Sequence, residues 1–314
     1  MLIAKAPAST FLMGEHAVLA GYPALLCALD KWISVKLTPS STDTVQIDSH
    51  LGSLSFSRHH LKVSKPLTFV TAVLCRYASQ FTHGFHIEIE SEFSHQQGLA
   101  SSAAVTVATL AAIRAYLNLP MDPATLFNEA RAVILDVQGK GSAADAAASI
   151  YGGCFAFHKD QGLIEHYTPP PFTLVYSGAK TPTAKVIANV DQDLKAFPEI
   201  QGKIYEAIGA CVDAARAALS QKDYQALGLL ANIHAGFYHC LQISSPILND
   251  LIAAALQYPD VTGAKISGSG LGDCIIVFGA LPRNTFPKTL SQKNLGVTQL
   301  SVQPSVRGVY VERD

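Results

Sequence analysis

The chain of 314 residues is long enough to form two lobes, each with its own hydrophobic core. Its 49% hydrophobic and 15% charged residues are typical of a compact globular protein, and a formal net charge of −1 gives no electrostatic reason to expect a nucleic-acid partner. The longest apolar run, residues 17–29, is too short to cross a bilayer and the N-terminus lacks the features of a secretory signal, so we expect a cytoplasmic protein with no membrane partner.

The first half of the chain mixes predicted strands with predicted helices. Hydrophobic patterning indicates strands at residues 2–6, 11–14, 32–37, 45–48 and 85–92. The predicted helices at 66–80 and 123–137 each begin with a proline, which fits the first turn of a helix. After the second strand, Glu15 and His16 place two adjacent polar side chains in a loop beside an apolar scaffold.

Residues 97–116 are predicted to form a tight loop that leads directly into a buried helix. Residues 98–102 are small apart from Leu99, and apolar side chains recur at helical spacing, at Leu99, Ala103, Val107, Leu110 and Ile113. The first N–H groups of such a helix lack intrahelical partners and lie at the positive end of the helix dipole. Because small side chains let a phosphate approach these groups, this junction is a candidate anion site.

A second loop followed by a helix of small residues covers 139–149 and carries one carboxylate, Asp145. An isolated acidic residue on an alanine-rich helix can be a helix cap or part of a solvated face. Because helices this rich in alanine pack closely, we expect Asp145 to lie where the backbone of another element approaches it.

The second half contains more helix. Strands are predicted at 154–158, 163–167 and 172–176, and helices at two places between 181 and 219, then at 224–241 and 246–257. No linker or repeat is evident, so any lobe boundary near residues 160–180 should be tight.

The last part of the chain contains a glycine-rich stretch, residues 263–274, before an apolar strand at 275–278. Such a loop can lie against an extended charged ligand or form a bulged hairpin. Residues 297–302 and 306–311 are predicted to form a terminal hairpin. The six cysteines are scattered without a Cys-x-x-Cys pair, which suggests neither a disulfide framework nor a zinc site.

Three candidate functional loops follow one another along the chain: Glu15 with His16, residues 98–104, and residues 268–272. Asp145 lies between the second loop and the third. Their order resembles the GHMP small-molecule kinases over nearly the whole chain. The runs Gly-Glu-His-Ala-Val at 14–18 and Gly-Tyr-Pro-Ala-Leu at 21–25 are most similar to the mevalonate kinase branch of that superfamily. The resemblance implies an α+β fold with a ribosomal protein S5-like N-terminal lobe, residues 1–170, and a ferredoxin-like C-terminal lobe, residues 171–314.

The resemblance also implies an activity: ATP-dependent, Mg²⁺-requiring phosphorylation of the 5-hydroxyl of mevalonate, an early step of isoprenoid biosynthesis. Asp145 would be the catalytic carboxylate, and a hydroxyl of Ser101 or Ser102 would bind Mg²⁺. The ATP phosphates would be wrapped by Gly98, Leu99, Ala100, Ser101, Ser102 and Ala103. The acceptor alcohol would be held by Glu15, His16, Thr183, Gly268 and Ser269.

The chain departs from the family pattern at two charged positions. Ser9 stands where these enzymes usually have the lysine that accompanies the catalytic aspartate. Lys140, in the loop before Asp145, is a candidate for the same charge, although it can equally be a solvated loop lysine. The usual Mg²⁺ glutamate, eleven residues before the aspartate, corresponds to Ile134.

Asp136 is the nearest acidic residue to Ile134. If the helix continues that far, Asp136 points about 200° away from Ile134, at about 3.6 residues per turn. Either the helix has ended or Asp136 is not the metal ligand. A Mg²⁺ site can function with few protein ligands, because the ion keeps several waters and also binds substrate phosphates.

Other acceptors and a non-catalytic role remain open at this stage. Leu271 and Asp273 in the third loop resemble phosphomevalonate kinase, so phosphomevalonate or another small alcohol is an alternative acceptor. The residues Ser9 and Ile134 also motivate a binding or regulatory homologue without catalysis. The sequence does not decide between a monomer and a homodimer.

Overall fold

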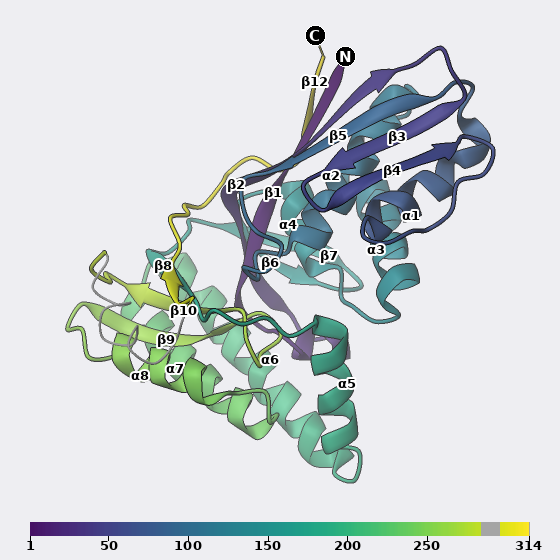
Figure 1. The fold of residues 1–314 in the computed structure, drawn as a ribbon. Coiled ribbons are helices and arrows are strands. Elements are labelled where there is room, and N and C mark those ends of the chain that lie inside the picture. The colour runs from purple at the N-terminus through teal and green to yellow at the C-terminus, as the bar shows by residue number, and fades with distance from the viewer. Residues whose placement is uncertain (284–295, 314) are drawn as a thin grey trace.

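A computed structural model describes residues 1–283 and 296–313, and within them two sheets belong to two lobes (Figure 1). The first sheet contains the strands up to Tyr167 and the last strand of the chain, and the second contains the four strands between them. Helices pack on both sheets, so the expected two-lobed α+β fold is confirmed.

The N-terminal sheet is built around two long strands that pair antiparallel, β1 (Leu2–Met13) and β2 (Ala24–Pro39). The strand order of this sheet is β12-β1-β2-β5-β3-β4. The first residues of β2 pair with β6, which in turn pairs with β7. The remaining strands are β3 (Thr44–Ser49), β4 (Gly52–Ser57), β5 (Phe85–Ser91), β6 (Cys154–His158), β7 (Gly162–Tyr167) and β12 (Tyr310–Arg313).

Four α-helices of this lobe cover the sheet and enclose the larger hydrophobic core. They are α1 (Thr68–Tyr77), α2 (Ser101–Tyr116), α3 (Pro123–Gln138) and α4 (Ala144–Tyr151), and short 3₁₀ turns occupy Ala17–Ala20 and Ala78–Gln80. Most of α2 is buried, because alanine and other small side chains let it lie close to β1 and β2. This packing fixes the N-terminus of α2 beside the lobe junction.

The C-terminal lobe has the antiparallel sheet order β11-β8-β10-β9. Its strands are β8 (Phe172–Tyr176), β9 (Val261–Ser267), β10 (Cys274–Gly279) and β11 (Thr298–Gln299). Its helices are α5 (Thr183–Asp193), α6 (Pro198–Gln221), α7 (Tyr224–Cys240) and α8 (Pro246–Ala255). A second hydrophobic core lies between this sheet and its helices.

The predicted terminal hairpin is wrong. Residues 298–299 pair with β8 in the C-terminal sheet, whereas Tyr310–Arg313 pairs with β1 in the N-terminal sheet. Local patterning shows that both segments can be strands, but it does not reveal that separate sheet edges are available as partners. The two termini therefore lie side by side in Figure 1.

Three local predictions also need correction. The two strands expected at 2–6 and 11–14 are one strand, β1, with a register shift between Pro7 and Ala8 that accommodates the proline. Residues 52–57 form β4, which the sequence analysis missed. The first part of the glycine-rich stretch is the strand β9, and the loop begins only at Gly268.

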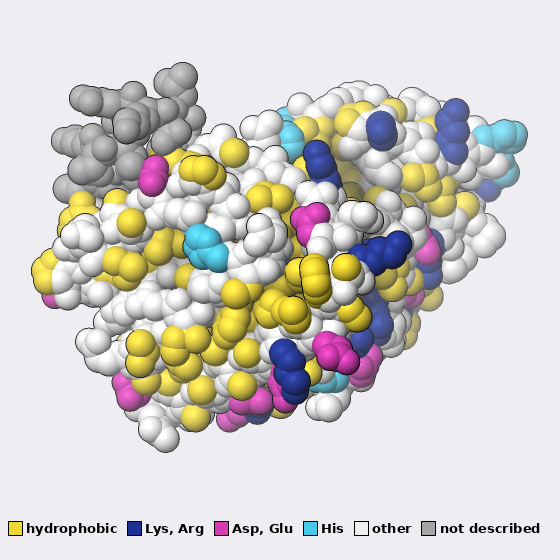
Figure 2. All heavy atoms as spheres, turned by 90° about the horizontal axis from the view of Figure 1, so that it is seen from below, with side chains coloured by type: hydrophobic (Ala, Val, Ile, Leu, Met, Phe, Trp, Pro, Cys, Tyr) yellow, Lys and Arg dark blue, Asp and Glu magenta, His cyan; other side chains and the backbone are white. Residues whose placement is uncertain are grey.

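The helical side of the C-terminal lobe exposes apolar side chains. Figure 2 shows hydrophobic side chains gathered on this lower face. Exposed large residues on α6 and α7 include Ile200, Leu229 and Ile233. The homodimer that the sequence left possible stays a prediction. Within residues 1–283 and 296–313, no helix has both the length and the apolarity needed to cross a bilayer.

Helix α7 packs on β9 almost backbone to backbone, which gives the first testable prediction. A Cβ atom at Gly228 would lie 2.4 Å from the carbonyl carbon of Thr262, too close for any real contact. We expect Gly228→Ala to lower the free energy of unfolding by about 1–3 kcal/mol, because it overpacks this interface. Urea denaturation measures the change.

Gly236 on the same helix is the matched control, because a Cβ atom there meets nothing within 4 Å. Gly236→Ala should be neutral or stabilise the protein by up to about 1 kcal/mol, through lower entropy of the unfolded chain. Equal effects of the two substitutions would contradict the close packing of α7 on β9.

Candidate active site

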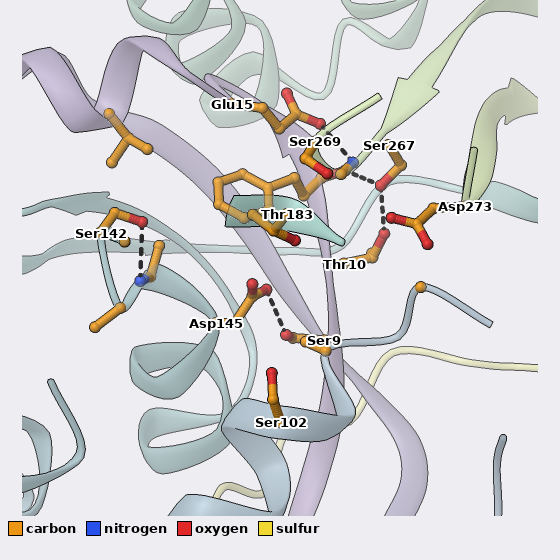
Figure 3. Close-up of a pocket in the computed structure, with 18 of the residues that line it drawn as sticks. Ser9, Thr10, Glu15, Ser102, Ser142, Asp145, Thr183, Ser267, Ser269 and Asp273 are labelled. Atoms are coloured by element: carbon orange, nitrogen blue, oxygen red, sulfur yellow. Dashed lines mark hydrogen bonds between the residues drawn. The ribbon is translucent and has the colours of Figure 1, made fainter. Parts of the chain in front are cut away.

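Two neighbouring cavities lie at the junction of the lobes. The smaller, about 140 Å³, is lined from the N-terminal lobe by β1, the loop after it, and the starts of α2 and α4, and from the C-terminal lobe by the 268–273 loop (Figure 3). The larger, about 920 Å³, extends from the start of α2 toward α1 and the segment after β8. The five residues that line both cavities are Ser101, Ser102, Gln138, Lys180 and Thr183.

The start of α2 supplies backbone donors to this junction. Ala100 adopts a left-handed conformation (φ 57°) and makes no side-chain cap, so the first N–H groups of the helix have no side-chain partner. Gly98, Ala100, Ser101 and Ser102 line the smaller cavity. The other two residues predicted to bind ATP, Leu99 and Ala103, are buried in the core and support the loop from behind.

The start of α4 faces the same cavity and carries Asp145. Ala143 precedes the helix in a left-handed conformation (φ 58°), and Asp145 lies in the first turn. The hydroxyl of Ser9, on β1, donates a hydrogen bond to Asp145 Oδ1 at 2.8 Å. In Figure 3 the Ser102 hydroxyl points toward Asp145 and Ser9. As expected from the alanine-rich helix, the carboxylate lies where the backbone of β1 passes close to it.

Burial raises the pKa of Asp145 to about 6. The Ser9 hydrogen bond opposes this rise, the negative charge of Glu15 adds to it, and the positive charge of Lys180 reduces it. A carboxylate with a raised pKa is a better proton acceptor than an ordinary aspartate. Asp145 can therefore act as a general base close to neutral pH.

Glu15 is buried at the junction and pairs with a lysine of the other lobe. Its Oε1 atom accepts from Lys265 Nζ at 2.6 Å and from the Gly268 N–H at 3.3 Å. The Lys265 side chain is fully buried on β9 and also lies over the ring of Tyr238, 5.4 Å from the centroid. The Glu15 carboxylate thus ties the loop after β1 to the C-terminal lobe.

His234 stands beside Glu15 without adding a charge. Its Nε2 atom is 3.6 Å from Glu15 Oε2 but accepts a hydrogen bond from the Gly14 N–H at 3.1 Å, so Nε2 carries a lone pair. Burial, aided by the Lys265 charge, lowers the pKa of His234 well below its usual value. The ring is neutral, and Lys265 is the cation that compensates Glu15.

His16 also bridges the lobes as a neutral ring. Its Nε2 atom lies 2.8 Å from the carbonyl oxygen of Ser269, which can only accept, so Nε2 must carry the proton. Burial lowers the pKa of His16. Its Nδ1 atom is then a buried acceptor without a hydrogen-bond partner among the described residues. A ligand hydroxyl can satisfy such an atom.

The C-terminal lobe contributes a loop of positive-φ residues to the cavity. The carbonyl oxygen of Gly268 (φ 97°) accepts a hydrogen bond from the Tyr238 hydroxyl. The Ser269 Oγ atom is buried without a hydrogen-bond partner among the described residues. Thr183, the first residue of α5, is exposed and lines both cavities. The structure therefore places Glu15, His16, Thr183, Gly268 and Ser269 on one cavity, and their role in holding the acceptor stays a prediction.

Asp273 closes this loop and lies against Gly98 of the N-terminal lobe. A Cβ atom at Gly98 would be 2.9 Å from Asp273 Oδ1. Asp273 is 5% exposed, Oδ1 has no hydrogen-bond partner among the described residues, and burial raises the pKa of this carboxyl to about 6. Ser102 and Asp273 each present an oxygen to the same cavity, and oxygen is the ligand type that Mg²⁺ prefers, so these two residues could hold such an ion.

Two predicted residues are not at the site. Asp136 is exposed and pairs with Arg76 at 2.9 Å. Helix α3 continues to Gln138, so Asp136 points away from the cavity that Ile134 lines, as helical geometry requires. Lys140 is also exposed and pairs with Asp191 of α5, so it does not accompany Asp145.

Sequence reasoning missed two charged residues that line the cavity, and also Lys265, the buried partner of Glu15. Asp273 was noticed only as an unusual residue of the third loop, and its position directly after a glycine run was the available signal. Lys180 lines both cavities, but its surrounding sequence carries no motif.

Comparison with known proteins decides the family. The model described as GHMP kinases N terminal domain matches residues 67–153, and that described as GHMP kinases C terminal matches residues 215–284. The chain is 32% identical to a mevalonate kinase of Archaeoglobus fulgidus, with 99% of this chain and 100% of the relative covered. The chain belongs to the GHMP kinase family.

Further comparisons agree with this membership. This GHMP kinase is 29% identical to a mevalonate kinase of Pyrococcus furiosus, over 99% of this chain and 98% of the relative. The crystal structure of the Methanococcus jannaschii mevalonate kinase has the same fold, with a TM-score of 0.79 at 22% identity, covering 96% of this chain and 98% of that one. The protein is a kinase similar to mevalonate kinases, with a small-molecule substrate.

The buried pair of Glu15 and Lys265 gives the second prediction. Lys265→Met leaves the Glu15 charge buried without its cation, so we expect the free energy of unfolding to fall by about 3–5 kcal/mol. The double variant Glu15→Gln with Lys265→Met removes both charges and should recover much of this loss. Urea denaturation of the three proteins tests this, and a double variant no more stable than Lys265→Met would argue against the pair.

Proposed function

We propose that this kinase transfers the terminal phosphoryl group of ATP to the 5-hydroxyl of mevalonate, with Asp145 as the general base. The observation that carries the proposal is one cavity shared by a buried carboxylate and the N-termini of α2 and α4. Phosphoryl transfer needs positioning and charge neutralisation more than covalent chemistry, and this arrangement provides both. The similarity to proteins named mevalonate kinase over 99% of the chain supports mevalonate as the acceptor.

The relative sizes of the two cavities support an assignment of the two substrates. The larger cavity is of the size that holds drug-sized ligands, so we place the nucleoside of ATP there. Its phosphates would then run along the start of α2, past Ser101 and Ser102, toward the smaller cavity. The smaller cavity would hold the acceptor alcohol next to Asp145.

The reaction then follows from these positions. The acceptor oxygen forms a bond to the terminal phosphorus while the bond from that phosphorus to the ADP oxygen breaks, and the hydroxyl proton moves to Asp145. The hydrogen bond from Ser9 orients the carboxylate. Ser102 and Asp273 would hold Mg²⁺, which neutralises charge on the phosphates when it is bound. Neutral His16 would accept a hydrogen bond from a hydroxyl of the acceptor.

The charges of the smaller cavity support mevalonate over phosphomevalonate. Among its described lining residues, Glu15, Asp145 and Asp273 are acidic, Lys180 is the one lysine or arginine, and His16 is neutral. A phosphorylated acceptor brings about 1.5–2 more negative charges and would need additional cations. The support for phosphomevalonate as the acceptor is the resemblance of Asp273 in the third loop to phosphomevalonate kinase. Phosphorylation of phosphomevalonate is therefore the second candidate function.

A comparison of acceptors tests the proposal and gives the third prediction. We expect ADP formation to depend on added mevalonate and to be at least tenfold slower with phosphomevalonate. Asp145→Asn should lower kcat by about 10²- to 10⁴-fold, because it removes the base, while nucleotide binding stays close to that of the wild type. Faster turnover with phosphomevalonate would select the second candidate, and full activity of Asp145→Asn would remove Asp145 from its role.

The pH dependence of kcat/KM gives the fourth prediction. The base must be ionised, and burial raises the pKa of Asp145 to about 6, so its active form is lost as the pH falls through that value. We expect kcat/KM to be flat above pH 7 and to fall about tenfold per pH unit below pH 6. A profile that stays flat down to pH 4.5, with the protein folded by circular dichroism, would exclude this role.

A further inference from the structure

The chain lacks a cation at position 9, and the lysines nearest the site in sequence do not replace it. Ser9 offers only a hydroxyl to Asp145. Lys5, on the same strand, pairs with Glu312 at 3.4 Å and lies near the ring of Tyr310. A phosphoryl group in transfer carries negative charge next to the ionised base, so a site without a cation would be strongly unfavourable.

Lys180 comes from a different part of the chain and lies where the two cavities meet. It belongs to the segment between β8 and α5, in the C-terminal lobe. Its Nζ atom donates to the carbonyl oxygen of His95, in the N-terminal lobe, at 2.6 Å. Of the five residues that line both cavities, Lys180 is the one that carries a charge.

The charge of Lys180 acts on two carboxylates of the site, those of Asp145 and Asp273. It lowers the pKa of Asp145 and that of Asp273, against the effect of burial on each. The other groups that act on the pKa of Asp145 are the Ser9 hydroxyl and the Glu15 charge. Because an ammonium group has three donors and the His95 carbonyl takes one, two remain for a ligand.

We propose that Lys180 contacts the phosphoryl group during transfer and supplies the positive charge that the chain lacks at position 9. The inference rests on the proposed function, because it assumes that the terminal phosphate crosses from the larger cavity to the smaller. At that crossing the ammonium group stabilises charge on the phosphoryl oxygens while the acceptor oxygen attacks and ADP leaves. Its bond to His95 also holds the two lobes around the site.

The test compares Lys180→Met with Lys180→Arg, which keeps the charge, and with Lys185→Met as control. Lys185 is an exposed lysine in the next helix, α5, and lines neither cavity. We expect Lys180→Met to lower kcat about 10²- to 10³-fold, as loss of one donor to a transition-state charge does elsewhere. Lys180→Arg should retain at least a tenth of the wild-type kcat, and Lys185→Met all of it.

A binding measurement without turnover separates this inference from the proposed function. Calorimetry with ADP and with a non-hydrolysable ATP analogue reports the contribution of the terminal phosphate. We expect the wild type to bind the analogue more tightly than ADP, and Lys180→Met to lose this difference while ADP affinity changes less than twofold. This result supports the inference even if mevalonate is not the acceptor.

Two outcomes would overturn the role of Lys180. One is a Lys180→Met variant with kcat within twofold of the wild type and an unchanged preference for the ATP analogue. The other is an equal loss of kcat in Lys180→Met and Lys180→Arg with an unchanged preference for the ATP analogue over ADP. That result would show that the hydrogen bond from Lys180 to His95 has a purely structural role. A wild type that phosphorylates no alcohol, yet shows the Lys180-dependent preference, would instead refute the proposed function alone.

Discussion

The buried contact between Glu15 and Lys265 is the constraint on which the site depends. Each side chain is almost fully removed from water, and neither charge could be kept there without the other. Glu15 follows β1 in the N-terminal lobe, and Lys265 lies on β9 in the C-terminal lobe. The same carboxylate accepts the N–H of Gly268, so the pair also fixes the loop that closes the cavity.

Smaller contacts repeat this connection between the lobes at other points. The hydroxyl of Ser267 donates to the carbonyl oxygen of Phe11, which leaves the Thr10 hydroxyl to donate to Ser267. His16 reaches the backbone of Ser269. These bonds join β1 and its loop directly to the end of β9. Hydrogen bonds therefore fix the cavity wall alongside apolar contacts between the lobes, in which α6 and α7 residues such as Val212 and Leu227 pack into the larger core.

The electrostatics of the cavity balance helix N-termini against buried carboxylates. Two helices direct free N–H groups at one space, which favours phosphate, while Asp145 and Asp273 oppose it unless a cation intervenes. A hydroxyl at Ser9 leaves Asp145 with a higher pKa than a lysine there would, since a neighbouring cation favours the charged form. In our proposals Lys180 of the C-terminal lobe, together with Mg²⁺, provides the missing positive charge.

The sequence by itself determined the features that depend on local patterning. The loop before α2, the alanine-rich helix with Asp145 and the loop with Glu15 and His16 were identified because small residues, helix spacing and motif order are visible along the chain. Most helices and strands followed for the same reason. The family resemblance then predicted which of these segments meet, and the structure places them around one cavity.

Only the tertiary structure decided which charged side chains serve the site. Asp136 and Lys140 are close to Asp145 in sequence, but helical geometry and ion pairs with Arg76 and Asp191 hold them elsewhere. Lys180, Lys265 and Asp273 are distant in sequence and reach the site only because the C-terminal lobe packs against β1 and α2. Electrostatic partners depend on distance in space, and no local pattern encodes that distance across two lobes.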